Sequence, residues 1–295
     1  MVIITVLICL FAERFLSSLH VFRSFTWLTY YADFILKHFS SVRLHNGKIP
    51  VLFIVLPPSL IVGLIDHLLY QPFFPFEFLF SIVILLYCFG PQTFYDRSKE
   101  LCHAEDINDN ACACWYGEKI LGRPLDRQEK INLPHVIAQS LFSISNDRIL
   151  APIFWFVLLG PLGAVLFRCS SQLYFITSKH NNNQQPYERI AYSANYLYAI
   201  LNWIPCRLSA FGFAAMGDFS HAMKAYSKIK NITFNLDQES NDLLLTSVGS
   251  AAINLPENPQ ETTSNKIADA LAIMRRNTQL WMGSIAFLTL AGWII

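Results

Sequence analysis

Four long apolar stretches divide the chain. They cover residues 49–67, 73–91, 149–167 and 279–295, and none of them contains Lys or Arg. A helix needs about 20 mainly apolar residues to cross the hydrocarbon core of a bilayer, and each stretch approaches that length. We therefore expect four transmembrane helices: a hairpin of two over 49–91, a third over 149–167 and a fourth over 279–295.

A shorter apolar segment, residues 1–12, begins the chain, and Glu13 and Arg14 interrupt it. At 1.5 Å per residue such a helix is only about 18 Å long, which is too short to cross a bilayer alone. No basic residue precedes it and no small-residue cleavage site follows, so it does not fit a secretory signal peptide. We expect a buried or half-inserted helix, with a tilted fifth span as the alternative.

Polar regions separate these stretches. Residues 13–48 mix basic and aromatic side chains, which suits an arm lying at the membrane interface. In residues 92–148, apolar side chains recur at helical spacing. Residues 168–278 contain a helical stripe ending at Pro205 and a linker over 254–264 that leads into the last helix. Arg207 is the only charged residue between 196 and 217, so this part either enters the membrane or packs against it.

No strand-like alternation is present, so the expected class is an all-α polytopic membrane protein with interfacial amphipathic helices. Composition agrees, because only 15% of the 295 residues are charged and soluble domains carry about 25%. A net charge of +1 argues against a nucleic-acid partner. The seven cysteines are scattered and form no disulfide framework. The expected partner is the lipid bilayer.

The orientation of the chain is weakly determined. If 49–91 is a hairpin, residues 13–48 and 92–148 share one side and carry twelve basic residues, against ten in 168–278. Short connections weigh most in the positive-inside rule, which favours the first two regions as cytoplasmic. Arg275 and Arg276, directly before the last span, argue for the opposite orientation.

Short motifs give little chemistry. The segment 117–124 approaches a phosphate-binding loop, but Arg123 and Pro124 replace the Lys and Ser/Thr that such a loop needs, so it indicates the end of a helix. Cysteine and histidine occur between 102 and 114 at a spacing that fits small buried side chains better than tetrahedral zinc. We therefore expect no metal and no cofactor, and we assign no catalytic residue.

Two longer stretches, 146–168 and 201–210, are more informative. Gly160, Gly163 and Ala164 thin one face of a helix so that another helix can approach. Arg207 beside Asn202 offers a cation and an amide able to hold an anion, although an interfacial Arg with a snorkelling stem is the alternative. The candidate residues for binding a ligand or partner are Glu13, Arg14, Asp147, Arg168, Asn202 and Arg207.

These stretches resemble the AmpE family of bacterial inner-membrane proteins and its larger relatives, the CobD/CbiB cobalamin-biosynthesis proteins. The likeness lies in the Ala-Pro start at 151, the Gly-Pro-x-Gly-Ala centre at 160 and the Asn-Trp-Ile-Pro-x-Arg-Leu motif at 202. Glu13-Arg14 and the apolar C-terminal helix also look like AmpE. The Asp-Pro and His-Pro features expected near the start of the cobalamin enzymes are absent, which favours AmpE.

The AmpE resemblance implies a multi-pass protein of the bacterial inner membrane that modulates signalling in β-lactamase induction and cell-wall recycling. It implies a membrane or cell-wall-recycling protein as partner and no established catalysis. The alternative is a CobD/CbiB-like enzyme that uses ATP to join an aminopropanol-type amine to a corrinoid carboxylate. A transporter or membrane scaffold is the third possibility.

Overall fold

A computed structural model of the chain describes residues 2–15, 25–39, 47–70, 74–90, 92–180, 185–229, 236–256, 258–259 and 264–292. Within these ranges the regular structure is helical and contains no strand. The prediction of an all-α class is confirmed.

The long helices follow the apolar stretches, and shorter helices fill the regions between them. Their bounds are α1 (Val2–Phe15), α2 (Thr26–Phe39), α3 (Lys48–Tyr70), α4 (Phe74–Cys88), α5 (Gln92–Asp106), α6 (Asn110–Leu121), α7 (Arg127–Ile131), α8 (Leu133–Ser145), the π-helix η2 (Asn146–Leu150), α9 (Ala151–His180), α10 (Gln185–Met216), α11 (Phe219–Ile229), α12 (Gln238–Ala252) and α13 (Ser264–Leu290).

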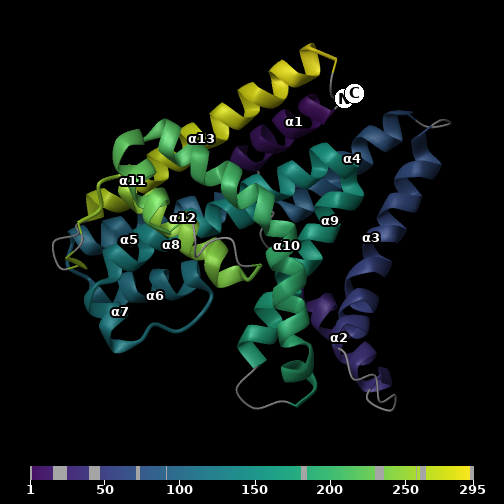
Figure 1. Ribbon diagram of the computed structural model, residues 1–295, viewed down its shortest axis with the longest axis horizontal. Coiled ribbons are helices and arrows are strands. Elements are labelled where there is room, and N and C mark those ends of the chain that lie inside the picture. Colours follow the sequence, from purple (N-terminus) through teal and green to yellow (C-terminus); the bar gives the residue numbers. More distant parts are fainter. Residues whose placement is uncertain are drawn as a thin grey trace.

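Helices α9 and α10 pack together at the centre of the molecule (Figure 1). Helix α3 lies along α9 at the right edge of that view, and α4 also packs on α9. On the other side, α8 is held between α12 and α13, and α5 packs on α6 and α13. Helix α10 therefore joins the two halves, because it contacts α9, α12 and α13.

Three helical segments of the described chain are long and apolar enough to cross a membrane: Lys48–Leu69, Leu133–Lys179 and Tyr187–Met216. Two shorter apolar helices, Ile3–Glu13 and Pro75–Cys88, accompany them. Large apolar side chains on the outside of α3, such as Leu60, Ile61 and Leu64, are exposed, as expected of a helix that faces lipid. The chain is an all-α membrane protein.

The set of long apolar helices differs from the expected one at 73–91, where α4 is one of the two shorter apolar helices, and at the C-terminus. Helix α13 was predicted to end in a span over 279–295, but it is not among the three. Its first half is polar and packs against α5 and α8, and residues 293–295 lie outside the described part. The segment Tyr187–Met216 takes a place in the set instead, and it contains all but the last residue of the stretch 196–217, whose entry into the membrane was left open.

Helix α9 reverses direction at Gly160. This residue has φ 64° and ψ −153°, a conformation that side chains other than glycine's disfavour, and Pro161 follows it. Ser171 lies 24 residues after Asp147 and donates a hydrogen bond of 2.5 Å to it. In a straight helix these residues would be about 36 Å apart. The segment therefore forms a helical hairpin, with one limb before Gly160 and one after it.

The hairpin corrects the expectation for 149–167, which was predicted to be a single transmembrane helix. The physical reason is the Gly160 turn, which places both ends of this apolar stretch at the same end of the hairpin. Gly163 does provide a close approach, but to the carbonyl of Trp155 in the first limb and not to a separate helix. The sequence stretch 146–168 thus runs from the base of one folded-back unit to its tip at Gly160 and back to the base.

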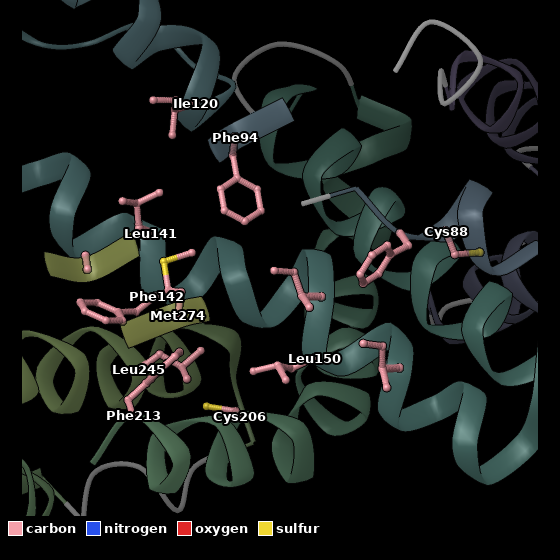
Figure 2. Packing of buried hydrophobic residues seen from close by; sticks show 14 of the residues in the cluster. Cys88, Phe94, Ile120, Leu141, Phe142, Leu150, Cys206, Phe213, Leu245 and Met274 are labelled. Atoms are coloured by element: carbon pink, nitrogen blue, oxygen red, sulfur yellow. The ribbon is translucent and has the colours of Figure 1, made fainter. Parts of the chain in front are cut away.

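Aromatic packing holds α12 and α10 against α8. The rings of Phe142 and Phe213 meet edge to face with their centroids 5.1 Å apart, in the group that Figure 2 shows with Leu245 and Met274. Gly249 on α12 faces Phe142, and a Cβ atom there would overlap the ring. This contact sets the distance at which α12 approaches α8.

One local prediction has a clear outcome. Gly122 ends α6 with a left-handed φ of 72°, so the segment 117–124 is a helix end as predicted. Asn132 stands at the N-cap position of α8, although its side chain makes no capping hydrogen bond.

Candidate functional site

The base of the hairpin begins with a π-helix, η2. It carries three polar residues in succession, Asn146, Asp147 and Arg148. The extra residue per turn changes the direction of each following side chain, and single π-turns inside helices often occur at functional sites. Here the π-turn presents Asn146 and Asp147 to the interior, where both are buried.

Asp147 is the centre of the site. Its Oδ2 accepts a hydrogen bond from Nη1 of Arg168 at 3.0 Å, and its Oδ1 accepts from Ser171 Oγ at 2.5 Å and from the Tyr198 hydroxyl at 2.8 Å. Arg168 and Ser171 come from the second limb and Tyr198 from α10. The carboxylate therefore fastens the base of the hairpin and ties it to α10.

A chain of amides continues from this point towards α12. Asn146 donates from Nδ2 to Asn202 Oδ1 at 2.7 Å, and its own Oδ1 accepts from Ser209 at 2.6 Å. Asn202 then donates to Gln238 Oε1 at 3.2 Å. These side chains are almost completely buried, with exposures of 2% or less. The amides link η2, α10 and α12 in one network.

Helix α12 completes the network with three residues of its first turns. Gln238 donates to Asp242 Oδ1 at 3.1 Å, and Asn241 donates to the carbonyl of Ala199 at 3.1 Å. Asp237 caps the start of this helix by accepting from the Ser240 amide at 2.7 Å. The cap fixes the first turn, so the polar residues of α12 face α10 in a defined register.

Arg207 borders the network on α10. Its guanidinium lies over the Trp203 ring, 3.7 Å from the centroid, and donates to the Trp203 carbonyl at 2.9 Å. A longer contact of 3.5 Å reaches Asn241 Oδ1. Stacking of this kind desolvates the cation while leaving its edge able to donate hydrogen bonds.

Asp242 is the acid of the network that lies outside the apolar helices. Burial raises the pKa of Asp242 to about 6, and the negative charge of Asp147 acts in the same direction. The hydrogen bond from Gln238 opposes the shift. A carboxylate whose pKa lies near the working pH is suited to accept a proton in one step and release it in another.

The structure brings together most of the predicted site residues. Asp147 and Arg168 form an ion pair, Asn202 lies in the adjoining amide chain and Arg207 borders it through Asn241. Glu13 is buried on α1, which packs on α4, α9 and α13. The side chain of Arg14 lies outside the described residues.

Sequence reasoning missed the residues that connect these four. Tyr198 and Ser171 carry hydroxyl groups of a kind common in any helix. Gln238, Asn241 and Asp242 look like the polar face of a surface helix when α12 is considered alone. The capped start at Asp237, followed by polar residues that face inward, is the signal that identifies them.

Metal-ligand residue types do not gather elsewhere. In the described part of the chain, no three His, Cys, Asp or Glu side chains lie close enough together to hold a metal ion. Cys102, the first cysteine of the cluster considered above, instead lies 3.8 Å from the carbonyl of Ser264. Burial and neighbouring acids raise the pKa of Cys102 to about 11, which favours the protonated thiol.

Comparison with known protein families identifies the family of this chain. Residues 5–242 match the family described as CobD/Cbib protein. The chain belongs to the CobD/Cbib family. The matched range ends at Asp242, so it contains η2, the hairpin, α10 and the polar turns of α12. Every member of the network described above lies within the CobD/Cbib match.

Curated relatives agree with the family. A probable cobalamin biosynthesis protein CobD of Pyrococcus furiosus is 26% identical over 160 residues, covering 53% of this chain and 54% of that protein. The cobalamin biosynthesis protein CobD of Stutzerimonas stutzeri is 26% identical over 107 residues, 36% of this chain and 34% of that protein. The chain spans between a third and 60% of the lengths of the first such relatives. No solved structure matches.

These findings correct the AmpE assignment. The family match and the curated relatives all point to CobD/Cbib proteins, so the expected role in β-lactamase induction, antibiotic response and cell-wall recycling is wrong. The motifs at 151, 160 and 202 lie in the hairpin and on α10, where they build the fold.

Proposed function

We propose that this chain is a membrane enzyme of cobalamin biosynthesis that forms an amide bond between an amine and a carboxylate of a corrinoid, with ATP as the source of free energy. The reaction is of the adenosylcobinamide-phosphate synthase type. The observation that carries the proposal is the CobD/Cbib match over 5–242, which contains the whole buried polar network. We place the enzyme in the bacterial inner membrane as a multi-pass protein.

The network supports an enzymatic role because burying its polar side chains costs free energy. Polar and charged side chains buried among apolar membrane helices are expensive and are usually kept for function. Asp147, Arg168, Asn202 and Gln238 are all at most 5% exposed. A network that served packing alone would be cheaper to build from apolar residues of the same volume.

The chemistry assigns separate roles to the two acids. An amine must lose a proton when it forms an amide, and Asp242 is the candidate acceptor because the pKa of its carboxyl is raised to about 6. Asp147 instead accepts three hydrogen bonds, from Arg168, Ser171 and Tyr198. We assign Asp147 to positioning: it holds Arg168, Ser171 and Tyr198 in place around the base of the hairpin.

A growth experiment tests the proposed function. A strain deleted for this gene is grown under conditions that require cobalamin, with either the corrinoid carboxylate or the amide-bearing product supplied. We expect growth on the product only, with growth on the carboxylate restored by the wild-type gene. Growth of the deletion strain on the carboxylate would exclude the proposed reaction.

The same strain separates the two acids. Asp242→Asn should fail to restore growth although the protein reaches the membrane in normal amount, because the amide cannot accept a proton. Asp269→Asn, a change at an exposed acid on α13, is the matched control and should restore growth fully. Equal growth with both variants would remove Asp242 from the reaction.

A further inference from the structure

Arg148 lies at the base of the hairpin, and within the described residues its side chain makes no hydrogen bond to the protein. It follows Asp147 in η2, its Nε lies 3.8 Å from Asp147 Oδ2, and 43% of its side chain is exposed. That distance is too long for a hydrogen bond. Within the described residues, no closer protein acceptor engages the guanidinium of Arg148, so its donors make no hydrogen bond to this chain.

Two further arginines act on the same place. The positive charges of Arg168, on the second limb, and of Arg97, on α5, both repel that of Arg148. Arg97 is anchored by a hydrogen bond of 2.8 Å from its Nη1 to the Lys119 carbonyl, and burial lowers the pKa of Arg97. The backbone joins these elements directly, because the amide of Gly90, just before α5, donates to the Arg148 carbonyl at 3.4 Å.

The single acid beside them is already occupied. Among the described groups whose charges act on Arg148, Asp147 is the only carboxylate, and it accepts hydrogen bonds from Arg168, Ser171 and Tyr198. Three guanidinium groups therefore share one negative charge, which leaves an excess of two positive charges. Arg168 also keeps its Nε buried without an acceptor, which is costly unless a ligand supplies one.

We propose that Arg148, Arg97 and Arg168 form a binding site for a phosphate group, either a phosphomonoester or a phosphoanhydride. A dianion matches the excess of two positive charges, whereas a single carboxylate would leave one charge uncompensated. Guanidinium groups also suit phosphate because their planar donors engage two oxygens at once. The proposed function is needed only to say that this phosphate belongs to a substrate of the enzyme. The binding of phosphate by these arginines does not rest on the proposed function.

Binding of inorganic pyrophosphate to the purified full-length protein tests the site. Isothermal titration calorimetry is performed on protein in phosphatidylcholine nanodiscs, for the wild type and for Arg148→Gln, Arg148→Lys and Arg276→Gln. Arg276 is exposed on α13 and provides a matched loss of charge. Thermal melting of each variant is measured alongside, and Arg148→Gln should fold normally because the side chain is half exposed and makes no hydrogen bond to the protein.

We expect Arg148→Gln to weaken pyrophosphate binding at least about tenfold, the effect of losing a charge-assisted contact. Arg148→Lys should recover part of the affinity, and Arg276→Gln should bind as the wild type does. Equal binding by wild type and Arg148→Gln, or no binding by the wild type at millimolar pyrophosphate, would overturn the proposal.

A second arm identifies where the phosphate comes from. The titration is repeated in nanodiscs containing phosphatidic acid, whose headgroup is a phosphomonoester, whereas phosphatidylcholine presents only a zwitterionic phosphodiester. Unchanged affinity assigns the site to a soluble phosphate compound, whereas competition that disappears in Arg148→Gln assigns it to a lipid headgroup. Neither arm uses corrinoid, so pyrophosphate binding with failed growth complementation would reject the proposed function and leave the phosphate site standing.

Discussion

The guanidinium of Arg168 donates to the carboxylate of Asp147 across 3.0 Å, although 21 residues of almost unbroken helix separate them in sequence. The pair is buried on both sides, with 6% of the Arg168 side chain and 8% of the Asp147 side chain exposed. It can form only because the helix folds back at Gly160. The ion pair therefore depends on the hairpin turn. If the turn opens, the two charges separate inside an apolar environment.

Removing one partner of this pair should be strongly destabilising. Arg168→Ala leaves Asp147 charged and buried, which costs about 3–5 kcal/mol in comparable buried pairs. The measurement is the thermal unfolding midpoint of the detergent-solubilised protein, with Arg276→Ala as the control. The double variant Asp147→Asn/Arg168→Gln should be more stable than Arg168→Ala, because neither charge is left unpaired. A midpoint for Arg168→Ala within error of the control would show that the pair does not hold the hairpin.

Gly160 should tolerate no side chain. Its φ of 64° with ψ −153° lies in a region that costs other residues about 1–3 kcal/mol, so Gly160→Val should lower the unfolding midpoint and reduce the amount of protein in the membrane. Gly283→Ala is the matched control, since nothing lies within 4 Å of a Cβ at that position. It should be neutral or slightly stabilising, because alanine favours a helix more than glycine does. Equal behaviour of the two variants would contradict a fixed turn at Gly160.

The close packing of α12 against α8 should depend on Gly249, because glycine has no side chain. A Cβ there would overlap the ring of Phe142, so Gly249→Ala should destabilise the protein by an amount typical of overpacking, about 1–3 kcal/mol. Phe142→Leu removes the obstructing ring at a cost of its own. The double variant should be more stable than the sum of the two changes predicts, which a double-mutant cycle of unfolding midpoints measures. Strict additivity would place the two residues out of contact.

Stability should fall as pH rises through the titration of Asp242. Burial raises the pKa of its carboxyl from 3.8 to about 6 in the folded protein, so between these values the folded state binds more protons than the unfolded state. The free energy of unfolding therefore decreases across this window as pH increases. Asp242→Asn should remove that slope and stabilise the protein at pH 7, as shown by unfolding midpoints measured from pH 4 to 7. Asp269→Asn should keep the slope of the wild type, and a slope retained by Asp242→Asn would assign it to another group.

Helix positions and half of the polar site follow from local patterns in the sequence. The start of α13 at Ser264 and the end of α6 at Gly122 are visible as a change from polar to apolar spacing and as a Gly-Arg-Pro sequence. Asp147, Arg168, Asn202 and Arg207 are conspicuous because charged and amide residues are rare near apolar helices. Their exact partners are not visible, since contacts such as Asn202 with Gln238 join residues on different helices.

The turn at Gly160 illustrates what a linear pattern cannot specify. A Gly-Pro pair within an apolar run is compatible with a kink, with a close helix contact and with a full reversal. Only the tertiary pairing of Asp147 with Arg168 and Ser171 selects the reversal. The family assignment failed because the motifs at 151, 160 and 202 were attributed to AmpE, whereas the family model that matches residues 5–242 is that of the CobD/Cbib proteins.

The reversal at Gly160 also changes how the chain is threaded through a bilayer. A hydropathy profile counts residues 149–167 as one crossing, which moves everything downstream to the opposite compartment. A segment that doubles back adds either no crossing or two crossings of the membrane. The number of crossings before and after it therefore stays both odd or both even, unlike the number that the profile gives. The polar residues at the two ends of the folded-back segment, Asp147 and Arg168, therefore lie together at its base.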